Sequence, residues 1–208
     1  MNGVITDDED CHESATKATF EKEGFEVTPE MYRKFCLGRP DTAAFQELIA
    51  EFQIRDRNSE YLISAKTLFY LELIKDNLKI YPGIVELIHG LHKKYTLALT
   101  TSSTFDEMET VMNKLQIGNL FKTIVTAEDV ERGKPDPEPY LLTAEKLGVN
   151  CEDCLVIEDS ENGVQSAKSA GMKCIAITNT EKPHNLQLAD RIVDKYSEIT
   201  EIFIQNLW

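Results

Sequence analysis

The pattern of apolar and polar positions divides the chain into two kinds of segment. From about residue 8 to residue 77, apolar residues recur with helical spacing. In the stretch DTAAFQELIAEF, the positions i, i+3, i+4 and i+7 are held by Phe45, Leu48, Ile49 and Phe52. A shorter helix is expected to begin after Thr28 and to stop at Gly38. The pattern therefore predicts a small helical bundle in this part of the chain.

Beyond Tyr81 the pattern changes to short, nearly continuous apolar runs. The runs YTLALTT, KTIVTA, CLVIED and KCIAIT are typical of strands that are buried on both faces. Amphipathic helices are expected between them, at roughly residues 83–94, 104–115, 137–147 and 161–170, and a last short strand near residues 191–193. Alternating strands and helices predict an α/β fold with a doubly wound parallel sheet.

The GVITD stretch at residues 3–7 is typical of the end of a loop that follows a strand at the edge of a sheet. Because this stretch precedes the helical segment, the helical segment interrupts the α/β pattern. We expect a core domain made of residues 1–8 and 79–208, with residues 9–78 inserted as a helical cap domain. The chain has 208 residues, 42% hydrophobic and 28% charged, which favours a folded globular protein over a disordered one.

The formal net charge of -14 changes the expected partners. A strongly acidic protein repels polyanions, so nucleic acid is not expected, and a phosphorylated ligand needs a local cation or a metal ion. No apolar run approaches the roughly 20 residues of a membrane span, and the amino end is acidic where a signal peptide is basic. We expect a cytoplasmic monomer that has no membrane partner.

The five cysteines are expected to be free thiols, with Cys11, Cys36 and Cys174 acting as small buried hydrophobic residues. Cys151 and Cys154 form a C-x-x-C pair, which in other settings indicates zinc or redox chemistry. No second pair accompanies it, and it leads into a strand instead of opening a helix. We therefore do not favour this alternative.

Polar residues that end the predicted strands are the candidates for chemistry, because ligands of open parallel sheets bind at the carboxyl ends of the strands. Thr101 and Ser102 follow one strand, Lys134 lies in a loop before a helix, and Glu158 and Asp159 end another strand. Taken singly, these are ordinary helix caps, a solvated lysine and acidic residues at a helix N-terminus. Together at one edge they supply an anion cradle, a cation and oxygen ligands for a metal, which predicts one phosphate site.

In these segments the sequence resembles the haloacid dehalogenase superfamily, in its β-phosphoglucomutase-like branch. The resemblance extends over the whole chain through GVITD, YPGIVELIHGL, LALTTSS, GKPDPEPY, VIEDSENGVQSAKSAGM and ADRIVD. It implies a Rossmann-like core with a cap, and a Mg²⁺-dependent phosphohydrolase or phosphomutase for a small phosphorylated metabolite, with sugar phosphates favoured. It further implies that Thr101 and the Ser102 amide hold the phosphoryl group and that Lys134 orders it. In the same family pattern, Asp159 with Glu158 beside it binds the metal.

The family's first motif is Asp-x-Asp-Gly-Val, in which the first Asp attacks phosphorus to form an aspartyl-phosphate and the second acts as general acid/base. Gly3 and Val4 match its end, Asn2 stands at the second Asp, and the position of the attacking Asp precedes Met1. We expect a hydrophobic strand ending in Asp before Met1. The Asn2 carbonyl can serve the metal, but its amide cannot exchange a proton, which typically costs about 10²–10⁴ in rate. The alternative is a pseudoenzyme that binds phosphorylated ligands without turning them over.

Two cap residues match positions that face substrate in this branch, His12 at the hinge after Asp7 and Lys66 in the bundle. The competing interpretation is a surface histidine and a surface lysine, and for Lys66 it is the stronger one. A dinucleotide oxidoreductase is excluded because no G-x-G-x-x-G follows a predicted strand.

Overall fold

The computed structural model describes residues 1–37 and 39–208. Gly38, where we expected the second helix to stop, lies outside the described residues. Two compact units are present, one made of Met1–Asp7 and Ile80–Trp208, and the other of Asp8–Lys79. The unit boundaries lie one residue from the expected ones, since Asp8 and Lys79 belong to the inserted unit. We refer to the two as the core unit and the cap unit.

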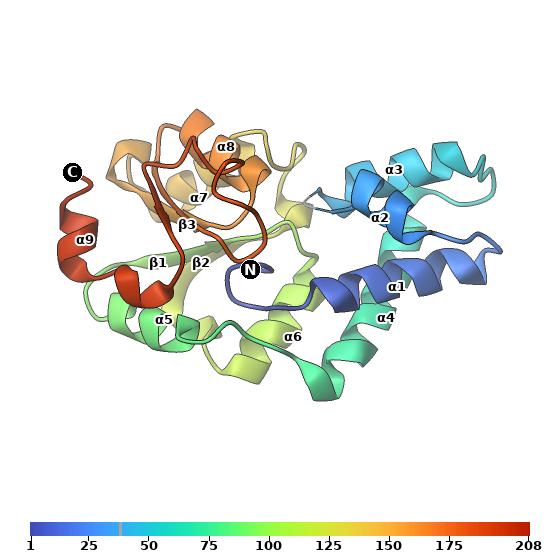
Figure 1. The fold of residues 1–208 in the computed structure, drawn as a ribbon, viewed down its shortest axis with the longest axis horizontal. Helices are drawn as coiled ribbons and strands as arrows, with labels where there is room; N and C mark the ends of the chain where they lie inside the picture. The colour runs from blue at the N-terminus through green and yellow to red at the C-terminus, as the bar shows by residue number, and fades with distance from the viewer. Residues whose placement is uncertain (38) are drawn as a thin grey trace. The chain divides into compact units, whose positions relative to one another are not determined.

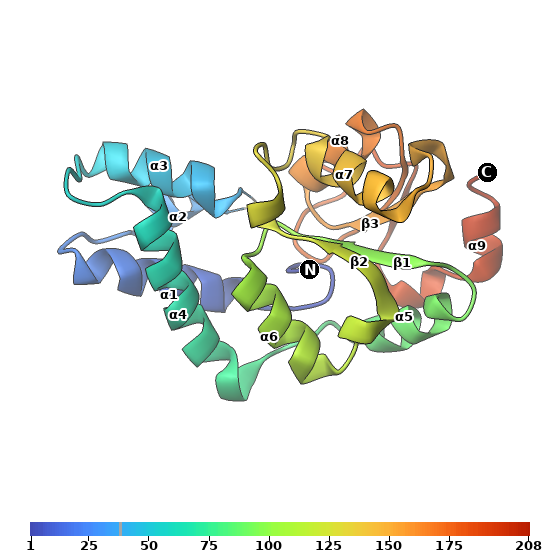
Figure 2. The same cartoon turned by 180° about the vertical axis from the view of Figure 1, so that it is seen from behind.

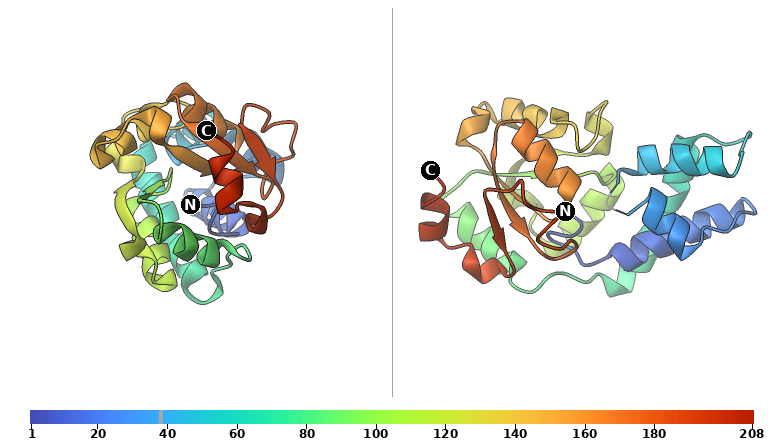
Figure 3. Two further views of the ribbon diagram at one scale, coloured as in Figure 1. Left: turned by 90° about the vertical axis from the view of Figure 1, so that its left-hand side faces the viewer. Right: turned by 45° about the horizontal axis from the view of Figure 1, so that its top comes forward.

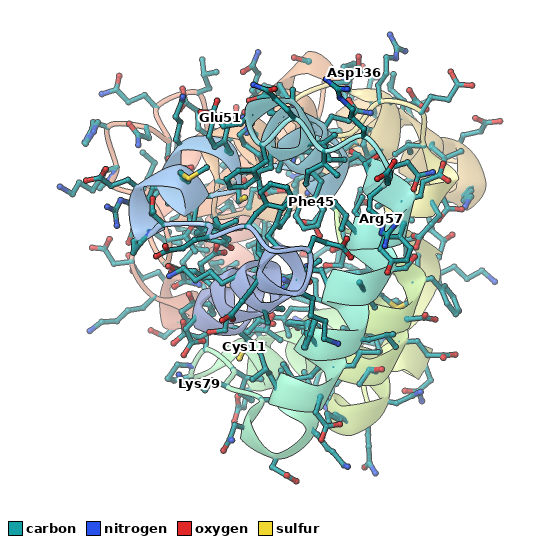
Figure 4. All side chains as sticks on the ribbon, turned by 90° about the vertical axis from the view of Figure 1, so that its right-hand side faces the viewer. Cys11, Phe45, Glu51, Arg57, Lys79 and Asp136 are labelled. Carbon is teal, nitrogen blue, oxygen red and sulfur yellow. The ribbon has the colours of Figure 1, made fainter. Side chains whose placement is uncertain are left out.

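The cap unit is helical, as its apolar spacing predicts (Figure 1). Its helices are α1 (Glu9–Lys22), α2 (Pro29–Phe35), α3 (Asp41–Glu51) and α4 (Ser59–Asn77). Helix α2 begins where the Thr28 hydroxyl accepts a hydrogen bond from the Met31 amide at 3.2 Å. The long helix α4 packs against α1 and α3. Fully buried Phe20, Phe45 and Leu62 form the centre of this unit, and Figure 4 labels Phe45 there.

The core unit contains all five expected strands, and each pairs in parallel with its neighbour. They are β1 (Leu97–Thr100), β2 (Phe121–Val125), β3 (Leu155–Glu158), β4 (Lys173–Ile177) and β5 (Arg191–Val193). The strands form two separate sheets, β1–β2 and β3–β4–β5 (Figure 3). Within the described part of the chain, β1 and β3 do not pair with each other. The parallel sheet expected from the sequence is therefore interrupted between these two strands.

Helices cover the strands of the core unit as expected for a strand–helix alternation. They are α5 (Ile84–His92), α6 (Phe105–Leu115), α7 (Glu138–Leu147), α8 (Glu161–Ser169) and the short C-terminal α9 (Glu201–Gln205). Each of the first four lies within two residues of its expected bounds. Figure 2 shows α5 and α7 on opposite sides of β1 and β2. Helix α8 packs on β3 and β4, where Val164, Cys174 and Leu186 are buried together with Tyr140.

The cysteines are free thiols, including Cys151 and Cys154. Cys36 and Cys174 are buried as expected, and burial raises the pKa of the Cys36 thiol to about 12. The expectation for Cys11 was wrong, because its place on α1 leaves it partly exposed (Figure 4). In the described residues, no helix is both long and apolar enough to cross a membrane.

Candidate functional site

The loop that follows β1 places three hydroxyl groups at the carboxyl end of the strand. The Thr101 amide still donates to the Val125 carbonyl at 2.9 Å, so the loop begins in register with β2. The Thr101 hydroxyl is buried and donates to Ser103 Oγ at 2.9 Å. Ser103 Oγ in turn donates to Asn2 Oδ1 at 2.6 Å. This chain of hydrogen bonds brings Thr101 and Asn2 into one site, whereas Ser102 between them in sequence is exposed.

Lys134 and Glu158 form a buried ion pair at the same edge. The ammonium group of Lys134 also donates to the Thr100 carbonyl at 3.4 Å, and the Tyr140 hydroxyl donates to Glu158 Oε1 at 2.6 Å. Burial by itself raises the pKa of Glu158, but the charge of Lys134 and the hydrogen bonds from Lys134 and Tyr140 together outweigh it and lower that pKa to about 2. Glu158 therefore stays ionised and fixes the position of the lysine.

Asp159 lies one residue further along and is 7% exposed. The Thr180 hydroxyl donates to its main-chain carbonyl at 2.9 Å and contacts its carboxylate as well. Burial, followed by the charge of Glu158, raises the pKa of Asp159 to about 7. A cation that binds beside such a carboxylate stabilises its ionised form, because the cation offsets the free-energy cost of burying the negative charge.

The loop formed by residues 1–7 passes directly over Asp159. Gly3 has φ of +75°, and a Cβ atom added there would lie 1.9 Å from Asp159 Oδ2. Glycine is therefore required on both conformational and steric grounds. The loop is held by Asn179, whose side-chain amide donates to the Gly3 carbonyl at 2.8 Å, and by Tyr196, which donates to the Val4 carbonyl. These contacts bring Asn2 next to the strand ends.

The chemistry of the donor set decides which metal would fit. Asp159 offers a carboxylate beside the main chain of Gly3, so the donor is a hard oxygen atom. Within residues 1–37 and 39–208, no group of three or more His, Cys, Asp and Glu side chains converges on one point. Mg²⁺ is typically held by one or two carboxylates, with water and substrate phosphate completing its shell. The residues fit Mg²⁺ better than a metal that needs a full protein cage.

Comparisons with known proteins show the family of the chain. The family model described as haloacid dehalogenase-like hydrolase matches residues 1–177. The chain belongs to this family. It is 33% identical over 179 residues to a phosphorylated carbohydrates phosphatase from Thermotoga maritima, over 84% of this chain and 81% of that protein.

Two further relatives extend the comparison. The chain is 27% identical over 177 residues to a fructose-1-phosphate phosphatase from Escherichia coli, over 85% of this chain and 93% of that protein. The crystal structure of β-phosphoglucomutase from Clostridium difficile superposes with a TM-score of 0.85 at 24% identity, over 99% of this chain and 93% of that one. At this identity the last likeness is one of fold alone.

Sequence reasoning missed several residues that build this haloacid dehalogenase-like site. They are Ser103, Tyr140, Asn179, Thr180 and Tyr196. A signal was present for Ser103, which continues the run of hydroxyl residues, and for Asn179 and Thr180, which follow β4 at the same sheet edge. No pattern pointed to Tyr140, because it is also a regular apolar position of α7.

Within the cap unit, His12 and Lys66 are both placed by buried contacts. His12 lies in the first turn of α1, not at a hinge before it, and stacks on Tyr70 with 4.2 Å between ring centroids. Tyr70 donates to Asp8 Oδ2 at 2.5 Å. Lys66 is only 2% exposed and pairs with Asp41 at 2.9 Å. The surface interpretation of Lys66 was therefore wrong, because α4 turns this lysine inward.

The buried position of His12 predicts a pH-dependent stability. Burial, and then the charge of Lys66, lower its pKa well below 6.5. As the pH falls below 6.5, the unfolded chain gains a proton on this residue while the folded protein does not, so folding loses stability by up to about 1.4 kcal/mol per pH unit. We expect His12→Gln to remove this component, measured as the difference in unfolding free energy between pH 7.5 and pH 5.

The control for this prediction is His89→Gln, since His89 is an exposed residue of α5. This variant should keep the wild-type dependence on pH. If the His12 and His89 variants follow the same curve as the wild type, the histidine is not held neutral by burial.

Proposed function

We propose that the protein transfers or hydrolyses the phosphoryl group of a small phosphorylated metabolite, and that sugar phosphates are its substrate class. One observation carries the proposal, namely that a buried hydroxyl from Thr101, the ammonium group of Lys134 and the carboxylate of Asp159 lie at the carboxyl ends of parallel strands in a haloacid dehalogenase-like fold. Two of the similar proteins are phosphatases whose names specify carbohydrate phosphates, which supports the substrate class.

The proposed roles follow from the charges of the site. In a protein with a net charge of -14, a phosphate needs local positive potential. Lys134 would supply it to the phosphoryl oxygens, held in place by Glu158. The amide of Ser102, an exposed residue, would donate a hydrogen bond to the same group, and the Thr101 hydroxyl would donate to it in place of Ser103. The geometry thus favours binding of a phosphate dianion over binding of a neutral ligand.

Mg²⁺ belongs to the same proposal. The Asp159 carboxylate and the Asn2 main-chain carbonyl would hold it, and Glu158 would support it from the adjacent position. When bound, the ion neutralises charge on the phosphoryl oxygens. Formation of an aspartyl-phosphate is the finer part of the proposal, since in the family motif the attacking Asp stands directly before the residue matched by Met1.

The test measures phosphate release and ligand binding on the same protein sample. In a protein that carries the attacking Asp directly before Met1, release from a panel of hexose and pentose phosphates should require Mg²⁺ and should disappear in Asp159→Asn and Thr101→Val. The surface variant Lys146→Ala, whose exposed pair with Asp129 lies outside the site, should behave as wild type. Absence of both release and binding of these ligands, with folding intact, would contradict the proposal.

A non-catalytic phosphate-binding protein is the second candidate, and Asn2 is the observation that favours it. Asn2 matches the acid/base position of the family motif, and its side chain accepts a hydrogen bond from Ser103. An amide in that position binds but does not transfer protons. Calorimetry distinguishes the two functions, because this candidate requires Mg²⁺-dependent binding of sugar phosphates without any release of phosphate.

In a protein that carries the attacking Asp directly before Met1, replacing Asn2 with aspartate is expected to raise turnover of sugar phosphates by about 10² or more, because a carboxylic acid can protonate the leaving oxygen. Ser103 can donate to the new carboxylate as it donates to the amide, so the loop is preserved. The gain should be much smaller for p-nitrophenyl phosphate, whose leaving group needs little protonation. Equal gains for both substrates would show that residue 2 is not the acid.

The cap residues are proposed to determine which substrates are accepted. In the same extended protein, we expect His12→Ala to lower kcat/KM for sugar phosphates about tenfold and to leave kcat/KM for p-nitrophenyl phosphate nearly unchanged, since a small activated substrate has no sugar for His12 to contact. His89→Ala is the matched control on an exposed histidine. Lys66 is buried and pairs with Asp41, which gives it a structural role. Lys66→Met should therefore be compared with Asp41→Asn, so that an effect on folding is distinguished from an effect on substrate binding.

A further inference from the structure

A short segment after β4 is held by hydrogen bonds at both of its ends. At one end, the side-chain amide of Asn179 donates to the Gly3 carbonyl at 2.8 Å. At the other end, Glu181 Oε1 accepts a hydrogen bond from the Glu161 amide at 3.0 Å, at the first residue of α8. Thr180 lies between these two anchored residues. Its backbone is therefore fixed on both sides, although the residue itself is exposed.

The hydroxyl of Thr180 contacts Asp159 at two points. It lies 2.5 Å from Oδ2 and 2.9 Å from the main-chain carbonyl oxygen of Asp159, so its single proton is shared between two oxygen atoms of one residue. This contact holds the Asp159 side chain in a fixed direction relative to its own backbone. Among the described residues, no hydrogen bond is made to Oδ1. One oxygen of the carboxylate is thus held, and the other remains available to a cation.

The neighbouring carboxylate, that of Glu158, has both of its oxygen atoms engaged. Oε1 accepts hydrogen bonds from Lys134 and Tyr140, and Oε2 accepts one from the Asp159 amide at 3.2 Å. These bonds use Glu158 to fix the lysine. Of the two acidic residues at the end of β3, Asp159 is therefore the one whose carboxylate has an oxygen atom without a hydrogen bond from the described residues.

We propose that Thr180 is a positioning residue for metal binding, which orients the Asp159 carboxylate so that Oδ1 is presented to Mg²⁺. Mg²⁺ demands nearly ideal octahedral geometry, so its affinity is sensitive to the direction of each carboxylate ligand. Loss of a hydrogen-bond partner of a metal ligand typically lowers metal affinity or activity by about 10–100-fold. The inference rests on the Mg²⁺ part of the proposed function and adds to it the residue that holds the ligand.

The test measures the affinity of the full chain for Mn²⁺ by electron paramagnetic resonance, because Mn²⁺ takes the same kind of oxygen ligands as Mg²⁺. Thr180→Val removes the hydroxyl and keeps a branched side chain, and we expect it to weaken binding about tenfold or more. Thr180→Ser keeps the hydroxyl and should bind Mn²⁺ nearly as the wild type does. Because residue 180 is exposed, the Tm of both variants should stay within about 2 °C of the wild-type value.

Two controls define what is measured. Thr178→Val is the matched variant, because the Thr178 hydroxyl also follows β4 but donates to Asp194 at 2.6 Å instead of Asp159. It should leave the Mn²⁺ affinity unchanged. Asp159→Asn identifies the site, since in a chain with a net charge of -14 other carboxylates also attract Mn²⁺. Binding that persists in Asp159→Asn belongs to those carboxylates and is subtracted.

A loss in Thr180→Val that Thr180→Ser recovers, with the Tm unchanged, supports the positioning role. If Asp159→Asn removes a Mn²⁺ site and Thr180→Val binds that site as tightly as the wild type, the role of Thr180 is overturned and the proposed function is unaffected. An equal loss in Thr178→Val overturns the role as well, because it shows a general loosening after β4. If Asp159→Asn changes nothing, the metal part of the proposed function is contradicted and the inference falls with it.

Discussion

Replacing Lys134 with alanine is expected to destabilise the protein by about 3–5 kcal/mol, which is a large part of the stability of an ordinary domain. Lys134 and Glu158 are 11% and 5% exposed, so truncation of the lysine leaves a buried carboxylate without its counter-charge. Tyr140 still donates to that carboxylate but carries no charge. The measurement is the free energy of unfolding at pH 7 in urea, with the slope compared between variants.

The matched control is Lys146→Ala. Lys146 also pairs with a carboxylate, that of Asp129 at 2.8 Å, but these side chains are 36% and 32% exposed. An exposed pair of this kind contributes about 0–1 kcal/mol. The double variant Lys134→Met with Glu158→Gln removes both charges and keeps an acceptor for Tyr140, so it should recover much of the loss. Similar costs for Lys134→Ala and Lys146→Ala would show that the Lys134 pair is solvated.

The elements of the fold were predictable because their signals are local. The apolar run CLVIED predicts a strand, and the structure has β3 at Leu155–Glu158; the expected burial on both faces is incomplete, because Leu155 and Ile157 are only half-buried. Polar residues at strand ends predicted where chemistry gathers, since the topology of a parallel sheet brings all carboxyl ends to one edge. This is why Thr101, Lys134 and Asp159 could be grouped before any geometry was known.

The partners of these residues could not be predicted, because contacts between distant segments leave no periodic trace in the sequence. Tyr140 reads as an apolar helix position until its hydroxyl is seen on Glu158. Lys66 reads as a surface lysine because charged residues are usually exposed, and only the packing of α4 turns it toward Asp41. The lack of pairing between β1 and β3 interrupts the parallel sheet that the sequence predicts, and no local apolar pattern signals it.

A substitution in α8 should reverse the usual effect of a helical glycine. Gly163 lies in the first turn of α8, and a Cβ atom added there would lie 2.1 Å from Glu158 Oε2 and 2.3 Å from Oε1. The glycine thus lets the helix approach the carboxylate that fixes Lys134. We expect Gly163→Ala to destabilise the protein by about 1–3 kcal/mol, because the carboxylate must move away from Lys134 and Tyr140.

Gly90→Ala is expected to change the stability of the same protein in the opposite direction. Gly90 is exposed in α5, and nothing lies within 4 Å of an added Cβ there, so alanine should stabilise by about 0.5–1 kcal/mol. Two further variants separate the steric effect of Gly163→Ala on stability from the effect of the Glu158 charge. In a Glu158→Gln background the shape is unchanged, and Gly163→Ala should remain costly. In a Glu158→Ala background the obstacle is gone, and the same substitution should become neutral or stabilising. A stabilising Gly163→Ala in the wild-type background would mean that the Glu158 carboxylate can move at little cost. The buried pair of Lys134 and Glu158 would then not be a rigid part of the site.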